Sequence, residues 1–148
     1  VDGRPWDSPE VAGDVERAAG PGAHLVRHDG PERFDVLPLL VATDGAIAAF
    51  GADGRRLRPN VVVGGVSDLT ERRWPGRLLR AGECVIELVE LRQRCVMTTY
   101  DPDTLEQDPG VLRRIQHEFG GTLALDTAVV TGGTLRVGDP VELLERGR

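Results

Sequence analysis

The chain has 148 residues, a length typical of one domain, and its 40% hydrophobic and 28% charged residues are typical of a folded protein. Its formal net charge of −6 argues against a nucleic-acid partner, because binding to a duplex depends mainly on neutralising phosphates. All 18 basic residues are arginine, which excludes Schiff-base chemistry on lysine. No apolar run approaches the ~20 residues of a membrane span and no leader resembles a signal peptide. We therefore expect a cytoplasmic protein without a membrane partner.

The first expected element is a helix that Ser8 caps, with Pro9 at its first position and a stop at Gly20-Pro21-Gly22. The pattern then predicts, in order, a strand over 23–28, a turn over 29–31, a short apolar run over 37–42, and a brief helix that Thr43 or Asp44 caps and Gly51 ends.

The later elements are mostly strands. Residues 60–63 form a β-branched run suited to a strand buried on both faces, and residues 84–91 predict an extended segment that continues to Thr99. Asp108-Pro109 begins the clearest helix. Strands over 123–131 and 134–144 are joined by Gly132-Gly133, a hairpin signal. Gly138-Asp139-Pro140 interrupts the last strand and suggests a bulge or an edge strand.

Strands outnumber helices, and some must pair out of sequence order. These features predict a mainly β fold with peripheral helices (α+β), built as a partly closed β-barrel within a single domain over 1–148.

Cys95 is the strongest candidate for chemistry. It follows Arg92 and Arg94 at an expected strand end, and positive neighbours favour the thiolate, which binds soft metals or carries sulfur. The alternative is a small buried core residue, which is the interpretation we favour for Cys84. The two cysteines would lie roughly 36 Å apart on a straight strand, which favours two free thiols in a reducing cytoplasm.

Arg58-Pro59-Asn60 is a second candidate site, because a guanidinium can grip phosphate and an amide can both donate to and accept from a heterocycle. The alternative is a surface arginine and an asparagine that starts a strand. The three histidines, His24, His28 and His117, form no zinc pattern with the cysteines. Glu71-Arg72-Arg73 is expected to be a solvated loop.

Taken in order, several motifs resemble those of the MOSC domain family, which forms the C-terminal domain of molybdenum cofactor sulfurases and of amidoxime-reducing components. The match covers about 34–144 and rests on the segments Arg58-Pro59-Asn60, Trp74, Arg94-Cys95 followed by Thr98-Thr99 and Asp101-Pro102, Phe119-Gly120, and 134–141. The RCxxTTxDP segment is the most specific of these.

The resemblance implies a molybdenum cofactor (molybdopterin) with Cys95 as the protein ligand of molybdenum. It assigns cofactor contacts to Arg58, Asn60 and Arg94, and we place Thr98 with them. The implied activity is an oxidoreductase that reduces N-hydroxylated substrates, with an electron-donor protein as partner. Full-length reducers also carry an N-terminal β-barrel domain that contributes to the cofactor, and this chain does not contain it.

One departure from the family pattern affects the site. Where the amidoxime reducers have a Thr-Ser pair before a proline, this chain has Val36-Leu37-Pro38, which offers no side-chain hydrogen bond. Two other functions therefore stay open: a sulfur or cofactor carrier with a persulfide on Cys95, and a non-catalytic scaffold that keeps the fold.

Overall fold

The computed structural model describes residues 3–28, 30 and 36–145, and the chain divides into two compact units, Val1–Phe34 and Asp35–Arg148. A single domain over 1–148 stays a prediction.

The first unit contains the helix α1 (Pro9–Ala19). The Ser8 side chain caps it by accepting a hydrogen bond of 3.3 Å from the Val11 amide, as predicted. The strand predicted over 23–28 is not formed, because these residues are mostly exposed and pair with no strand in the described part of the chain. The turn predicted over 29–31 falls largely outside the described residues.

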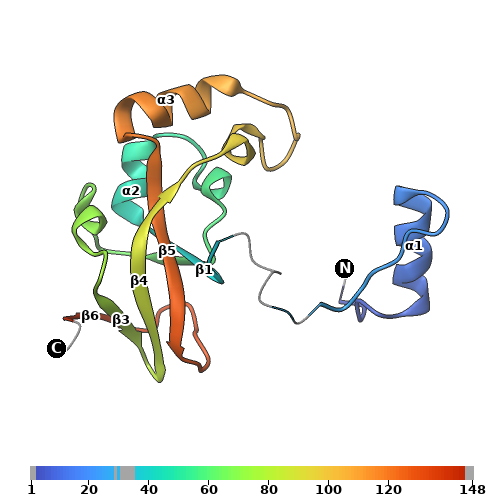
Figure 1. Cartoon of the computed structure of the whole chain (residues 1–148), viewed down its shortest axis with the longest axis horizontal. Coiled ribbons are helices and arrows are strands. Elements are labelled where there is room, and N and C mark those ends of the chain that lie inside the picture. Colours follow the sequence, from blue (N-terminus) through green and yellow to red (C-terminus); the bar gives the residue numbers. More distant parts are fainter. Residues whose placement is uncertain (1–2, 29, 31–35, 146–148) are drawn as a thin grey trace. The chain divides into compact units, whose positions relative to one another are not determined.

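A single six-stranded sheet forms the frame of the second unit, with the strand order β2-β1-β5-β4-β3-β6 (Figure 1). Its strands are β1 (Leu39–Thr43), β2 (Val61–Val63), β3 (Leu78–Ala81), β4 (Cys84–Gln93), β5 (Thr122–Thr131) and β6 (Val141–Leu144). β1 and β2 are parallel, and the other neighbours are antiparallel. The sheet curls into a half-barrel, so the predicted mainly β, α+β fold with strand pairing out of sequence order is confirmed.

Two α-helices and three single-turn 3-10 helices accompany the sheet. They are α2 (Asp44–Phe50), η2 (Gly54–Leu57), η3 (Thr70–Arg73), η4 (Val96–Thr99) and α3 (Pro109–Phe119). Thr43 caps α2 and Asp108 caps α3 through their side chains, and left-handed glycines end both helices, which confirms both predicted helices. In the described residues, no helix combines the length and the apolar character needed to cross a bilayer.

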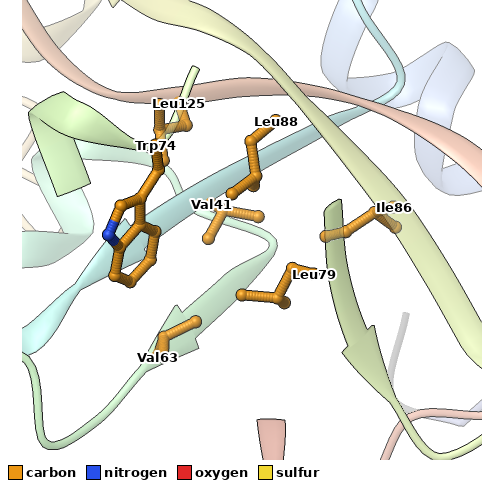
Figure 2. Packing of buried hydrophobic residues seen from close by; sticks show 7 residues of the cluster. All are labelled: Val41, Val63, Trp74, Leu79, Ile86, Leu88 and Leu125. Carbon is orange, nitrogen blue, oxygen red and sulfur yellow. The ribbon is translucent and has the colours of Figure 1, made fainter. Parts of the chain in front are cut away.

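Two hydrophobic clusters hold this unit together. The first lies among the strands and against Trp74, as Figure 2 shows, and consists of Val41, Val63, Trp74, Leu79, Ile86, Leu88 and Leu125. The second packs the helices against the start of β5 and consists of Phe50, Leu57, Ile115, Phe119 and Leu123. Because the second cluster contains Leu57 and Leu123, it fixes η2 beside the sheet, and η2 leads directly into the candidate site.

Two predicted strands of the sheet, β4 and β2, differ in the structure. β4 ends at Gln93 instead of continuing to Thr99, because the Arg94 amide bonds to the Gly121 carbonyl and the chain then turns into η4. β2 is an edge strand, so Val62 is 52% exposed and the expected burial on both faces was wrong.

The predicted hairpin of two long strands is also wrong. β6 spans only Val141–Leu144 and pairs with β3, not with β5. In the connecting segment, a turn forms in which the Asp139 amide bonds to the Arg136 carbonyl and its carboxylate accepts from the Arg136 amide. This turn, with Pro140 after it, interrupts the chain where Gly138-Asp139-Pro140 predicted an interruption, and β6 is an edge strand of the sheet.

The expected solvated loop at Glu71-Arg72-Arg73 is the largest correction in the helical segments. Glu71 is 0% exposed, and its carboxylate accepts a hydrogen bond of 3.3 Å from the Thr43 hydroxyl. Arg72 donates to the carbonyl oxygens of Phe119 and Thr122 at 2.9 and 3.2 Å. The first two residues of this charged run therefore tie η3 to β1 and to the junction between α3 and β5.

Candidate functional site

A cleft of about 260 Å³ lies where β4 ends, next to β1 and the residue that follows η2. The polar side chains in its lining are Arg58, Asn60, Arg92, Gln93, Arg94, Cys95 and Asp126. The apolar side chains are Val36, Leu37, Leu39, Leu40, Leu57 and Met97. The fold thus brings the two candidate segments of the sequence, 58–60 and 94–95, to one place.

Cys95 presents an exposed free thiol to this cleft, whereas Cys84 is free and buried, with 6% of its surface exposed. The buried-core interpretation is therefore confirmed for Cys84 and wrong for Cys95. Cys95 has an extended backbone between the end of β4 and η4. A thiol in this position is accessible to a metal, an electrophile or a sulfur donor.

Thr98 holds the backbone of Cys95. Its side chain is buried, and both its amide and its hydroxyl donate to the Cys95 carbonyl, at 3.2 and 2.9 Å. Thr98 is not part of the cleft lining. The geometry therefore gives this residue a positioning role next to the thiol, and its contact with a cofactor stays a prediction.

Arg94 lines the cleft and also forms a hydrogen bond that stabilises the fold. Its guanidinium donates a hydrogen bond of 2.7 Å to the Leu57 carbonyl, and its buried Nε has no partner among the described residues. Burial, with a smaller contribution from nearby Arg92, lowers the pKa of Arg94 to about 10. Arg94 therefore remains a cation near neutral pH, with one polar atom left unsatisfied.

Arg58 and Asn60 form another part of the wall. Arg58 is exposed and adopts a left-handed backbone conformation, with φ of 54°, where η2 ends. The side-chain oxygen of Asn60 accepts a hydrogen bond of 2.8 Å from the Leu40 backbone amide, and the backbone amide of Asn60 donates to the Leu40 carbonyl. Because its oxygen is engaged by β1, Asn60 offers a ligand chiefly the two donors of its side-chain amide.

Two further arginines connect η2 to the segment that follows Cys95. Arg56 donates to the Thr99 carbonyl at 2.9 Å and to the Asp101 carboxylate at 2.8 Å. Arg55 forms ion pairs with Asp53 and Asp103 at 2.7 and 2.6 Å. Together with the Arg94 bond to Leu57, these contacts fix the loop that carries Cys95 relative to Arg58.

Arg92 and Asp126 are paired in the same cleft, with distances of 3.4 and 3.5 Å from Arg92 Nη1 to the two carboxylate oxygens. Asp126 is 5% exposed, and burial raises its pKa above the usual range, although Arg92 opposes the shift. Sequence reasoning missed Asp126. The available signal was a single charged residue within the otherwise uncharged strand that spans Thr122–Thr131.

The apolar substitution noted in the sequence lies in the cleft itself. Val36 and Leu37 both line it, and Val36 is half exposed. A ligand that meets this part of the wall finds only the backbone as a source of hydrogen bonds.

A second hollow of similar volume, about 270 Å³, lies between the edge strands β2 and β6. It shares Asn60 with the cleft but is lined mostly by apolar side chains, and its thiol, Cys84, is buried. We place the candidate site in the Cys95 cleft, because only that hollow combines an exposed thiol with several cationic groups. Among the described residues, no group of three or more His, Cys, Asp or Glu could hold a metal ion.

The family model for the MOSC domain matches residues 43–142 of the chain, and the chain belongs to this family. Among curated proteins, it is similar to human mitochondrial amidoxime reducing component 2, with 29% identity over 131 residues (72% of this chain and 37% of that protein). It is also similar to mouse mitochondrial amidoxime-reducing component 1, with 32% identity over 133 residues (74% and 37%). The chain therefore spans well under half the length of these relatives.

Solved structures support the fold alone. YiiM from Escherichia coli superimposes with a TM-score of 0.54 at 16% sequence identity, covering 76% of this chain and 56% of that one. A crystal structure of a hypothetical protein superimposes with a TM-score of 0.52 at 17% identity, covering 86% of this chain and 56% of the other.

Proposed function

We propose that this chain is the molybdenum-cofactor-binding domain of an oxidoreductase that reduces N-hydroxylated substrates, with Cys95 as the protein ligand of molybdenum. Membership of the MOSC family and similarity to proteins named as amidoxime-reducing components support this class of function. The observation that carries the proposal is the exposed thiol of Cys95 in a cleft that Arg58, Arg92 and Arg94 also line.

The residues present suit the proposed cofactor. A thiolate is a soft ligand that favours a thiophilic metal, and arginines bind phosphate through paired N–H groups. The unsatisfied buried Nε of Arg94 is a further unused donor beside the cleft. When bound, the cofactor supplies the redox chemistry.

The candidate residues at the cleft then have defined parts in binding. Cys95 coordinates the metal through its thiolate, Arg58 and Asn60 donate hydrogen bonds to the cofactor, and Thr98 keeps the backbone of Cys95 in place. At about 260 Å³, the cleft is slightly smaller than the ~300–1,000 Å³ of typical ligand pockets, which suits it to hold part of a large cofactor. We assign the remaining contacts to another domain, and the delivery of electrons to a separate donor protein.

The test is elemental analysis for molybdenum, with pterin fluorescence after acid oxidation, on protein from a host that makes the cofactor. Three proteins are compared: the wild type, Cys95→Ala, and Cys84→Ala as a matched control, since Cys84 is buried outside the cleft. We expect stoichiometric molybdenum in the wild type and the control and its loss in Cys95→Ala. Equal molybdenum in all three proteins would refute the assignment to Cys95.

A sulfur carrier is the second candidate, favoured by the exposure of the same thiol. In that case Cys95 would hold a persulfide, and the protein would release cyanide-labile sulfur without reducing amidoximes.

A non-catalytic scaffold is the third alternative. Val36 and Leu37 in the cleft wall offer no side-chain hydrogen bond, which favours weak binding of a cofactor. A scaffold would show neither molybdenum nor labile sulfur and would be unaffected by Cys95→Ser.

A further inference from the structure

Asp126 is a buried acid in the cleft that the proposed cofactor binding does not use. It is the only charged residue of β5, where it pairs in register with Leu40 of β1 and Glu90 of β4. Its side chain lines the same cleft as Cys95, although only 5% of the residue is exposed. Burying a carboxylate is costly unless strong partners compensate, so its presence here calls for a physical reason.

Arg92 compensates only in part. Its distances of 3.4 and 3.5 Å to the two carboxylate oxygens are long compared with the ~2.7–2.9 Å of strong charge-assisted hydrogen bonds. Burial raises the pKa of Asp126 more than Arg92 lowers it. Among the described residues, the other charged groups that act on it are Glu90 on β4, which raises the pKa, and Arg94 beyond β4, which lowers it. Arg58 also lines the cleft, and β1 contributes the uncharged Leu40.

We propose that Asp126 is the proton donor of this cleft, giving a proton to the oxygen that leaves an N-hydroxylated substrate. The inference rests on the proposed reductase function. A carboxyl group whose pKa is raised by burial in a partly dry cleft, beside a cation that can stabilise its conjugate base, has the properties of a general acid.

Reduction of an N-hydroxylated group breaks the N–O bond and consumes two electrons and two protons, giving N–H and water. The two electrons come from an external reductant, for example two equivalents of a reduced viologen dye. Asp126 supplies the proton that leaves with the oxygen as water, and solvent supplies the proton on nitrogen. Arg92 then stabilises the Asp126 carboxylate until solvent reprotonates it.

This role predicts a specific dependence on pH. A general acid works in its protonated form, so turnover should fall as the pH rises through the pKa of Asp126. Arg92 lowers that pKa by stabilising the carboxylate, and Arg92→Gln removes this effect. The fall in activity of the Arg92→Gln variant should therefore move to higher pH, a change that a purely structural role for the pair does not predict.

The experiment uses the full-length native protein, loaded with cofactor and assayed with reduced methyl viologen and an arylamidoxime. Molybdenum content and the pH dependence of turnover are measured for the wild type, Asp126→Asn, Asp126→Glu, Arg92→Gln and the exposed control Asp7→Asn. We expect Asp126→Asn to keep its molybdenum and lose about 10²- to 10⁴-fold in turnover, with partial recovery in Asp126→Glu. Asp7→Asn should match the wild type.

A second readout does not depend on activity. Carboxyl ¹³C NMR of the protein without cofactor follows the titration of Asp126, identified by its loss in Asp126→Asn, and should place its pKa above the ordinary 3.8. Titration at or below that value would overturn the inference. Full turnover in Asp126→Asn, or loss of its molybdenum, would also overturn it. Absence of molybdenum from the wild type would instead refute the proposed function, and the role of Asp126, which rests on it, would be refuted as well.

Discussion

The Arg94 guanidinium donates a hydrogen bond of 2.7 Å to the Leu57 carbonyl, which fastens the residue before Cys95 to the residue before Arg58. The two halves of the candidate site come from segments that are far apart in the sequence, and this bond joins them directly. Leu57 is fully buried in the cluster of α2, α3 and β5, so the anchor point is rigid. Arg94 therefore holds the Cys95 side of the cleft in a fixed position relative to the helical core.

We expect Arg94→Met to destabilise the protein by about 1–3 kcal/mol, because it leaves the Leu57 carbonyl without its charged donor. The free energy of unfolding from urea titration measures this effect. Arg113→Met, at an exposed position on α3, serves as the control and should change stability little. An unchanged unfolding midpoint in Arg94→Met would show that the bond to Leu57 contributes nothing to the fold.

Arg56 should control how freely the loop after Cys95 moves. Its hydrogen bonds to the Thr99 carbonyl and the Asp101 carboxylate hold the far end of η4 against η2. We expect Arg56→Met to raise the rate at which a thiol reagent modifies Cys95 in the folded protein, because the loop loses this attachment. Buried Cys84 is an internal control whose rate should stay low in both proteins. Equal Cys95 rates in wild type and variant would contradict the expectation.

Local signals predicted the helices well. The caps at Ser8, Thr43 and Asp108 and the glycine stops act within a few residues of the helix ends, so the sequence contains the whole interaction. Strand partners were harder to predict, since β6 pairs with β3 across a long stretch of chain. The prediction of a hairpin at Gly132-Gly133 was wrong, because the pairing of β6 with β3 and the turn at Asp139 determine where the last strand begins.

The candidate site was predictable where the residues form a recognisable segment, as at Arg58, Asn60, Arg94 and Cys95. Asp126 and Arg92 could not be recognised as a pair from the sequence, because the pairing of β4 with β5 is what places this carboxyl group and this guanidinium in one cleft. Glu71 was misjudged for the same reason, because its burial depends on Thr43, which is distant in sequence. Charge alone in a sequence does not distinguish a solvated group from a buried one.

The stability of the protein should carry a pH dependence from Glu71. Burial raises the pKa of Glu71 above its ordinary value of 4.5, and the bond from Thr43 and the charge of Arg72 offset this only in part. Between 4.5 and the raised pKa, the folded state binds more protons than the unfolded state, so the free energy of unfolding falls as the pH rises.

The variant Glu71→Gln removes this titration while keeping the shape of the side chain. The free energy of unfolding of the variant, relative to wild type, should therefore increase as the pH rises through that window. Urea unfolding from about pH 5 to about pH 8 measures the trend. Glu83→Gln, at an exposed position, provides the comparison. A constant difference between Glu71→Gln and wild type across this range would show that Glu71 does not titrate differently on folding.

Ala124 lies between two leucines that belong to different hydrophobic clusters. Leu123 packs with the helices and Leu125 with the strands, although they are two residues apart on β5. Residues two apart on a regular strand face the same side of a sheet. The positive φ of Ala124, 67°, breaks that alternation and coincides with a shift in the register of β5 against β4.

A left-handed conformation costs a non-glycine residue about 1–2 kcal/mol, and glycine avoids this cost while losing roughly 0.5–1 kcal/mol of chain entropy. Ala124 is fully buried, so the substitution also removes a buried methyl group worth about 0.8 kcal/mol. We therefore expect Ala124→Gly to change stability by less than about 1 kcal/mol in either direction. Ala128→Gly, on the same strand at a residue without a positive φ, should instead lower it. Urea midpoints of the two variants decide the matter: if both lose stability equally, the backbone at Ala124 stores no strain, and the side chains of Leu123 and Leu125 alone fix the irregularity.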